Sequence, residues 1–97
     1  MPKKYKDRKS AKIRQSARGE VCTLRQDGCG RYPDSTVFCH LNTPFKGMGL
    51  KSPDLFGVYG CYHCHLLLDS GQVPKADQLR ALIETQYKLL NKGLIQI

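Results

Sequence analysis

The middle of the chain alternates apolar and polar residues in the way that a β-hairpin does. The segment 36–41 is rich in β-branched and aromatic residues, which predicts a strand. Alternation places two sets of side chains on opposite faces of this strand, with Thr36, Phe38 and His40 on one face and Val37, Cys39 and Leu41 on the other. The segment 56–59 predicts a second strand, after a loop over 42–53 that is rich in Gly, Pro and Lys. A further short strand is expected at 21–24, followed by a turn-rich loop over 26–35.

Two helices are predicted after the hairpin. Residues 61–70 form a short helix that ends at Gly71, a residue suited to the left-handed position after a helix. A longer helix opens with Pro74 and is ended by Gly93. Its apolar residues recur at helical spacing, and we expect them to pack on the core: Leu79, Leu82, Ile83, Tyr87 and Leu90. The segment 8–18 lacks such a stripe, so a helix there is expected to form weakly or only on a partner.

Size and composition predict one small α+β domain. The chain has 97 residues, of which 40% are hydrophobic and 25% charged. Burial alone stabilises so small a domain by only about 3–5 kcal/mol, so a crosslink is expected. The chain lacks both an apolar run of the ~20 residues that a membrane span needs and the apolar region of a secretory signal. We therefore expect a cytoplasmic protein with no membrane partner, in which the cysteines stay reduced and metal ligation is favoured over disulfides.

The positive charge is concentrated at the N-terminus. The net charge is +8, and the first 20 residues hold eight of the 16 basic side chains but two of the eight acidic ones. The eight are Lys3, Lys4, Lys6, Arg8, Lys9, Lys12, Arg14 and Arg18. A basic arm over residues 1–19 is suited to a nucleic-acid backbone, because binding to phosphates releases counterions. The alternative is a solvated helix or tail that has no partner.

Two cysteine pairs predict a structural Zn²⁺ site. Cys61 and Cys64 are separated by two residues at the start of a predicted helix, which is a strong signal for zinc. Cys22 and Cys29 are separated by six residues, so the Asp-Gly turn between them must fold the loop back. The alternative is that these are small buried cysteines of the core. Cys39 is left over, and we interpret it as a core thiol.

A second group of residues predicts an open cation site. His65 and Asp69 are four positions apart on the helix that begins at Cys61, so an imidazole and a carboxylate project from one face. We expect the strand to bring His40 to the same point. In one alternative, His63 or His65 replaces a cysteine in the zinc site. In another, Asp69 is only a surface residue near a helix end.

These motifs together resemble the HNH endonucleases, whose core is a ββα-metal, treble-clef fold. The resemblance rests on the two cysteine pairs, on the runs 37–41 and 47–56, and on His65 and Asp69 after the second pair. The chain looks still more like the small prophage-encoded nucleases of the YbcO family, a likeness that covers nearly its whole length. The resemblance implies an HNH-like zinc-binding nuclease domain over residues 20–97, with a C-terminal packing helix and a basic N-terminal arm.

The resemblance also implies roles for single residues. His40 matches the general base that takes a proton from water, and His65 matches a ligand of the catalytic cation. Asp69 falls where some HNH enzymes place a further ligand, and Asp54 falls near the central Asn of the motif. Cys39 stands where many members carry a metal-binding Asp or His, and a soft thiol is a poor ligand for Mg²⁺. Mg²⁺ or Mn²⁺ is the implied catalytic cation.

The implied function is metal-dependent hydrolysis of DNA phosphodiesters. Lys46 and Lys51 flank the long loop and are expected to contact the phosphate backbone, with a solvated loop as the alternative. No feature of the sequence predicts base reading. We therefore expect low sequence specificity, or specificity supplied by DNA structure or by a partner such as a recombination or replication protein. The alternative function is a non-catalytic, zinc-stabilised module that binds nucleic acid or protein.

Overall fold

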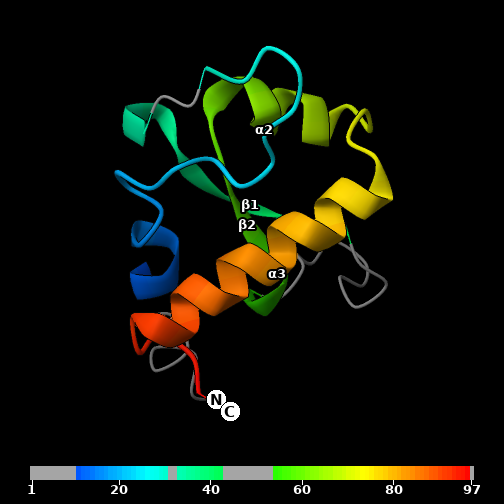
Figure 1. Cartoon of the computed structure of the whole chain (residues 1–97). Coiled ribbons are helices and arrows are strands. Elements are labelled where there is room, and N and C mark those ends of the chain that lie inside the picture. The colour runs from blue at the N-terminus through cyan, green and yellow to red at the C-terminus, as the bar shows by residue number, and fades with distance from the viewer. Residues whose placement is uncertain (1–10, 31–32, 43–53, 97) are drawn as a thin grey trace, which may run out of the picture.

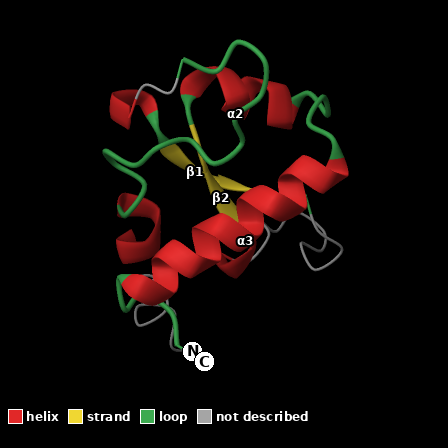
Figure 2. Ribbon diagram, in the orientation of Figure 1, coloured by secondary structure: helices red, strands yellow, loops and turns green. Residues whose placement is uncertain are grey.

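The computed structural model of the chain describes residues 11–30, 33–42 and 54–96. Figure 1 shows a two-stranded hairpin at the centre, with one helix above it and a long helix crossing in front. Figure 2 shows the same α+β arrangement by element type. Seven of the predicted nucleic-acid contacts lie outside the described residues, namely Lys3, Lys4, Lys6, Arg8, Lys9, Lys46 and Lys51.

The hairpin consists of β1 (Val37–His40) and β2 (Gly57–Gly60), which are antiparallel. Phe38 pairs with Tyr59, and His40 pairs with Gly57 at the end of the ladder. Glycine is needed opposite His40 because a Cβ at Gly57 would lie 2.1 Å from the Phe38 ring. Short 3-10 helices precede each strand, η1 (Pro33–Ser35) and η2 (Asp54–Phe56). The two predicted strands are thus confirmed to within one or two residues at each end.

The strand predicted at 21–24 is absent from the described part of the chain. This segment still lies beside β2, because the Thr23 N–H donates to the Tyr59 carbonyl oxygen at 2.7 Å. The ladder does not continue, since Arg25 takes a left-handed backbone conformation with φ of 43°. The turn at Arg25 leads the chain away from the sheet and toward Cys29. The prediction was wrong because strand propensity was outweighed by the turn that the cysteine loop requires.

Helices α2 (Tyr62–Asp69) and α3 (Lys75–Asn91) follow the hairpin. Gly71 and Gly93 adopt positive φ of 76° and 74° just after the two helices, which confirms the predicted helix ends. Both helices contact β2. In the described residues, no helix is long and apolar enough to span a membrane. The core lies between α2, α3 and one face of the hairpin, and it includes Cys22, Leu24, Cys39, Leu41, Val58, Cys61, Cys64, Val73 and Ala81.

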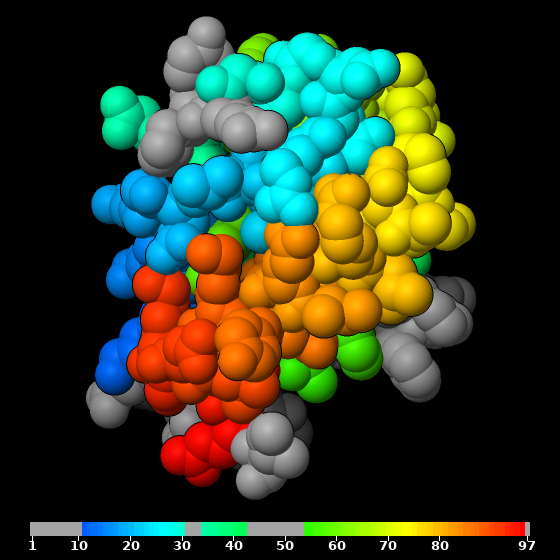
Figure 3. Space-filling view, in the orientation of Figure 1, coloured from blue at the N-terminus to red at the C-terminus, as the bar shows by residue number. Residues whose placement is uncertain are grey.

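The buried face of α3 differs from the predicted one. The buried residues are Ala81, Thr85 and Leu89, whereas three residues of the predicted core stripe are exposed: Leu79 by 58%, Ile83 by 58% and Tyr87 by 67%. Leu82 and Leu90 are half-buried. Small side chains let the helix backbone approach β2 closely, and there Thr85 forms hydrogen bonds. Figure 3 shows α3 running across the surface of the molecule.

The N-terminal segment packs against the hairpin. Residues 11–15 are helical, and Ile13 and Ala17 are buried. The Ser16 hydroxyl forms a 2.8 Å hydrogen bond with the Tyr59 hydroxyl. Buried apolar contacts of this kind stabilise a helix that has little intrinsic stability of its own. The described part of the arm is therefore fixed to the same hairpin that carries His40.

Candidate functional site

Four cysteines form a cluster that can hold a metal ion. The Sγ atoms of Cys22, Cys29, Cys61 and Cys64 all lie within 4.8 Å of one another, and the Cys29 and Cys61 sulfurs are 3.7 Å apart. A tetrahedral site with Zn–S bonds of about 2.3 Å separates its sulfurs by about 3.8 Å. Cys61 and Cys64 come from the start of α2, and the other two come from the loop over 22–29. The donor set and its spacing therefore fit Zn²⁺.

The cluster is chemically suited to a cation. All four thiols are free of disulfides, and only Cys29 is partly exposed. Burial raises the pKa of the Cys64 thiol, and the nearby Cys22 raises it further. The Gln26 N–H donates a hydrogen bond to Cys64 Sγ and lowers this pKa in part. Four close thiolates repel one another in a buried site, and a divalent cation removes that repulsion. Metal binding therefore stabilises an arrangement that thiols alone do not favour.

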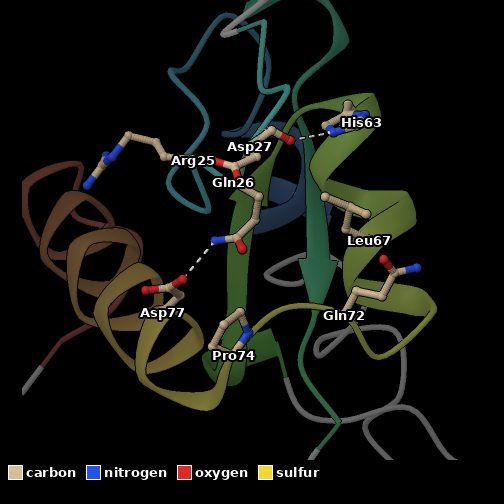
Figure 4. A pocket seen from close by; sticks show the side chains of 8 residues that line it. All are labelled: Arg25, Gln26, Asp27, His63, Leu67, Gln72, Pro74 and Asp77. Atoms are coloured by element: carbon tan, nitrogen blue, oxygen red, sulfur yellow. Dashed lines mark hydrogen bonds between the residues drawn. The ribbon is translucent and has the colours of Figure 1, made fainter.

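The loop that carries Cys22 and Cys29 is held by α2. His63 Nε2 is hydrogen-bonded to the Asp27 carbonyl oxygen at 2.8 Å, as Figure 4 shows. Gly28 has φ of 84°, and a Cβ there would lie 2.6 Å from His63 Nε2. This Asp-Gly turn folds the loop back as predicted. His63 bonds to the loop and His65 pairs with Asp69, and neither histidine belongs to the four-cysteine group.

Cys39 lies in the core beside the cluster, as predicted. Its side chain is buried, and its Sγ is 3.6 Å from the Val37 carbonyl oxygen. Burial raises the pKa of the Cys39 thiol to about 12, and the negative charge of Asp69 adds to the effect. A thiol with so high a pKa stays protonated near neutral pH. Cys39 is not one of the four grouped ligands.

His40 and Asp54 form a close pair at the end of the hairpin. His40 Nε2 and Asp54 Oδ1 are 2.5 Å apart, and the exposed fractions of the two side chains are 20% and 14%. A carboxylate oxygen accepts hydrogen bonds, so this contact suits a His40 ring that carries its proton on Nε2. In that tautomer Nδ1 carries no proton. The Phe38 ring packs edge-on against the imidazole, with centroids 5.5 Å apart, and holds its orientation.

A third residue joins this pair from the arm. Arg14 Nη1 lies 3.5 Å from Asp54 Oδ2. The sequence prediction treated Arg14 only as a contact to nucleic acid, and it missed this ion pair. The pairing joins residues that are 40 positions apart, and charge alone did not distinguish Arg14 from the other basic residues of the arm.

His65 and Asp69 form a separate pair on α2. His65 Nε2 and Asp69 Oδ2 are 3.4 Å apart, and both side chains are open to solvent. An imidazole nitrogen and a carboxylate oxygen suit a divalent cation. In the described residues, the group of ligand atoms that could hold a metal is that of the four cysteines, and it includes none of His40, His65 and Asp69. The structure thus brings together His40 with Asp54, and His65 with Asp69, as two pairs.

Several cavities open on the surface of the described part of the chain. One of about 330 Å³ separates the N-terminal segment from β1, and its basic residues are Arg14 and Arg18, four positions apart. A second, of about 530 Å³, lies between the cysteine loop, α2 and the start of α3 (Figure 4). It is spanned by a bond of 3.1 Å from Gln26 Nε2 to Asp77 Oδ2. The first cavity lies along β1, the strand that ends at His40, whereas the second is lined by His63, which the sequence offered only as an alternative zinc ligand.

Comparison with known proteins places the chain in a family. A family model described as "Putative nuclease YbcO" matches residues 11–90. A solved structure described as "Structure of a putative bacteriophage protein from Escherichia coli str. K-12 substr. MG1655" is similar with a TM-score of 0.66 and 30% sequence identity. That match covers 84% of this chain and 100% of the other. No curated protein matches the chain. These matches suggest a phage-associated hydrolase of nucleic acids, and the chain belongs to the YbcO family of nucleases.

Proposed function

We propose that this chain is an HNH-type endonuclease that hydrolyses DNA phosphodiesters with the help of a divalent cation. The hairpin followed by α2, with the cysteine cluster at the helix start, supports a treble-clef, ββα-metal core. The observation that carries the proposal is the His40–Asp54 pair. A half-buried carboxylate that contacts one ring nitrogen of a histidine, with the other nitrogen available to take a proton, is the arrangement of a general base.

His40 acts as the base in this proposal. Asp54 accepts a hydrogen bond from the Nε2–H group of His40, and Nδ1 takes a proton from the attacking water. The hydroxide then attacks phosphorus, and the bond to the departing DNA oxygen breaks. A well-placed general base contributes about 10²–10⁴-fold to the rate. Asp54 lies against the imidazolium that forms and stabilises it.

His65 and Asp69 would hold the catalytic cation, with Mg²⁺ or Mn²⁺ as the candidates. Their nitrogen and oxygen donors are open to solvent on α2, so a cation has access to them. Such a cation stabilises negative charge on the phosphate and on the departing oxygen. Cys39 does not contribute a ligand, because its thiol stays protonated and soft sulfur suits these cations poorly.

The four cysteines would hold a structural Zn²⁺ with no open position for substrate. The ion ties the loop over 22–29 to the first turn of α2, and it thereby fixes the helix that carries His65 and Asp69. A closed four-thiolate site supplies folding free energy rather than chemistry. Zinc and the catalytic cation therefore have separate roles.

The arm over residues 1–19 would bind the DNA backbone, and residues 20–97 would form the nuclease domain. Lys12, Arg14 and Arg18 are the basic arm residues that the structure describes, and two of them line the cavity beside β1. Lys46 and Lys51 would extend this contact. Phosphate contacts position DNA without reading its sequence, so low specificity is expected unless a recombination or replication protein or a DNA structure supplies it.

The test is plasmid nicking by His40→Ala in the presence of Mg²⁺ or Mn²⁺. We expect nicking to fall at least 100-fold while zinc content stays unchanged, because His40 lies outside the cysteine cluster. His63→Gln is the matched control, since in the described residues this histidine is hydrogen-bonded to the Asp27 carbonyl oxygen of the cysteine loop. Equal rates for His40→Ala and wild type would contradict the base assignment. Wild-type protein that binds DNA without cutting would favour a non-catalytic, zinc-stabilised binding module.

A further inference from the structure

The cavity between the N-terminal segment and β1 is suited to an anion. Its volume is about 330 Å³, with Arg14, Gln15 and Arg18 on one wall and Val37 and Phe38 on the other. No acidic side chain is among the described residues that line it. Two like charges on one wall repel each other, and a bound anion removes that repulsion. The cavity therefore favours a negatively charged ligand.

The two arginines are positioned by the packing of their own segment. Ile13 and Ala17, the residues directly before them, are both buried. Between the arginines, the Ser16 hydroxyl forms a 2.8 Å hydrogen bond with a tyrosine hydroxyl of β2. These contacts fix the backbone that presents Arg14 and Arg18. A ligand that binds there orders less of the chain, and less conformational entropy is lost on binding.

Both guanidinium groups have N–H donors available for a ligand. Arg14 is 48% exposed and directs only Nη1 toward Asp54, at 3.5 Å. A guanidinium has five N–H donors, so others remain. Arg18 is exposed, and its side chain forms no ion pair with the acidic residues that the structure describes. Because the planar fork of arginine matches the oxygens of phosphate, a phosphate group is the anion that this wall fits.

The opposite wall fits a sugar better than the edge of a base. Val37 is 44% exposed and Phe38 is half-buried, and neither side chain has a hydrogen-bond donor or acceptor. Reading a base requires such groups, whereas the CH groups of deoxyribose pack on apolar side chains. The two walls together therefore suit one sugar-phosphate unit of a strand.

Two lining residues connect this cavity to the proposed base. The Phe38 ring packs edge-on against the His40 imidazole, with centroids 5.5 Å apart. Arg14 contacts Asp54, the carboxylate that is paired with His40. A ligand in the cavity is thus separated from the His40–Asp54 pair by a single side chain on either wall.

We propose that this cavity is a subsite for a second phosphate of the cut strand, whose oxygens are bound by Arg14 and Arg18. Val37 and Phe38 pack on its deoxyribose. The inference rests on the proposed function, in which His40 acts on a phosphodiester beside the subsite. It adds a substrate requirement, because the strand must carry a charged phosphate beyond the one that is cut. Binding of that remote phosphate holds the scissile bond at the base.

The first test measures binding without cleavage. Zinc-loaded, full-length protein in phosphate-free buffer, with no Mg²⁺ or Mn²⁺ added, is titrated with thymidylyl-thymidine, which holds one internal phosphodiester. We expect the NMR signals of the Arg14 and Arg18 side-chain N–H groups to shift and saturate. Arg25 and Arg80 are internal controls that should stay unchanged, because Arg25 pairs with Glu84 at 2.6 Å and Arg80 donates to backbone carbonyl oxygens.

Two further ligands identify the group that binds. Thymidine has no phosphate and should leave the arginine signals unchanged. Thymidine 5′-monophosphate has a terminal phosphate in place of an internal one. Saturation by the monophosphate but not by thymidylyl-thymidine would place a strand end in the cavity and overturn the assignment. Equal shifts of Arg18 and Arg25 with thymidylyl-thymidine would overturn it too.

The second test measures cutting of an end-labelled duplex in which a neutral methylphosphonate replaces one phosphate. Besides losing the modified linkage, wild type should cut one other bond of that strand, at a fixed distance, about tenfold more slowly. This second gap should be absent in Arg18→Gln, which has already lost the contact. Arg18 is varied because Arg14 also contacts Asp54. Lys75→Gln removes the same charge from an exposed residue of α3 and should keep the gap.

The two hypotheses fail in different ways. A second gap that is equal in wild type and Arg18→Gln, or absent from wild type, would overturn the subsite, while the cutting itself would uphold the nuclease function. A wild-type protein that cuts no DNA, with Arg14 and Arg18 signals that saturate in the first test, would overturn the proposed function and leave the phosphate site intact.

Discussion

Thr85 of α3 bonds to the backbone of Tyr59 in β2. The Tyr59 N–H donates to the Thr85 hydroxyl oxygen at 3.2 Å, and the Thr23 hydroxyl, 3.2 Å from that of Thr85, donates to the Tyr59 carbonyl oxygen at 2.9 Å. All three residues are buried. These bonds pair the backbone N–H and C=O groups of Tyr59 in β2. They also fix which side of α3 faces the hairpin.

We expect Thr85→Val to destabilise the protein by about 1–3 kcal/mol. Valine fills the same space but leaves the buried Tyr59 N–H without an acceptor. Ile83→Ser should change stability by only about 0.5 kcal/mol or less, although it removes a larger apolar side chain, because Ile83 is exposed. Urea unfolding of the two variants checks the prediction. A larger loss in Ile83→Ser would mean that the exposed stripe is covered.

The cysteine cluster predicts about one tightly bound zinc per chain. Cys61→Ser or Cys64→Ser should release zinc and unfold the domain, because metal binding supplies folding free energy. Elemental analysis and circular dichroism measure the two effects. Cys39→Ala serves as the matched control and should keep its zinc, since Cys39 is not among the grouped ligands. A folded wild-type sample without bound metal would contradict the assignment.

Two deletions distinguish the contribution of the arm's charge to DNA binding from the contribution of its packing to stability. Deleting residues 2–10 removes five basic side chains and one acidic one. We expect weaker DNA binding for all sequences and a flatter plot of log affinity against log salt, by about 0.9 for each phosphate that the shortened arm no longer neutralises. Thermal stability should change little. Salt titrations on two unrelated duplexes check this, and weaker binding to one sequence alone would mean that the arm reads bases.

Deleting residues 2–18 should in addition lower the melting temperature. This longer deletion removes the buried Ile13 and Ala17 and the Ser16–Tyr59 hydrogen bond. It also removes Arg14 and leaves Asp54 without that ion pair. Equal melting temperatures for the two deletions would show that residues 11–18 do not contribute to the stability of the domain.

The ion pairs of Glu20 predict that part of the stability of the fold is lost in acid. Its carboxylate lies 2.7 Å from Lys92 Nζ and 3.5 Å from Lys88 Nζ. The Lys92 hydrogen bond holds the pKa of Glu20 below its ordinary value of 4.5. A lowered folded-state pKa means that the contribution is complete above the ordinary value and is lost as the pH falls through the folded pKa.

We therefore expect Glu20→Gln to destabilise the protein by about 1 kcal/mol or less at pH 7 and by less still near pH 3. Urea unfolding at the two pH values measures the difference. Asp34→Asn, which alters an exposed carboxylate of η1, is the control and should show no such difference. An equal effect of Glu20→Gln at both pH values would contradict the contribution of this ion pair.

Local patterns predicted the elements better than they predicted the packing. The β-branched run before His40 and the glycines after the helices depend on neighbouring residues, and the structure has both hairpin strands and both helix ends. The face of α3 depends instead on hydrogen bonds from Thr85 to residues 26 and 62 positions away. Apolar spacing on the helix does not contain that information, so Leu79, Ile83 and Tyr87 were assigned to the wrong side.

The candidate site shows the same division. The spacing of Cys61 and Cys64 and the turn at Gly28 predicted the cysteine cluster correctly, because ligand geometry restricts the spacing. His65 and Asp69 are close because one helical turn separates them. Arg14 and Asp54 meet only through the packing of Ile13 and Ser16. No spacing rule applies to a contact between two segments so far apart.

The cysteine cluster also closes a ring of the polypeptide chain that contains the proposed base. Cys29 and Cys61 are 32 positions apart, and the chain between them contains both strands, His40 and Asp54. A Zn²⁺ ion held by the four cysteines would close this ring much as a crosslink does, and it would remove chain entropy that the open segment otherwise keeps. Uptake of the ion and folding of the hairpin would then be one event. If the proposed site is correct, the supply of zinc would limit how many of these chains fold with His40 and Asp54 in place.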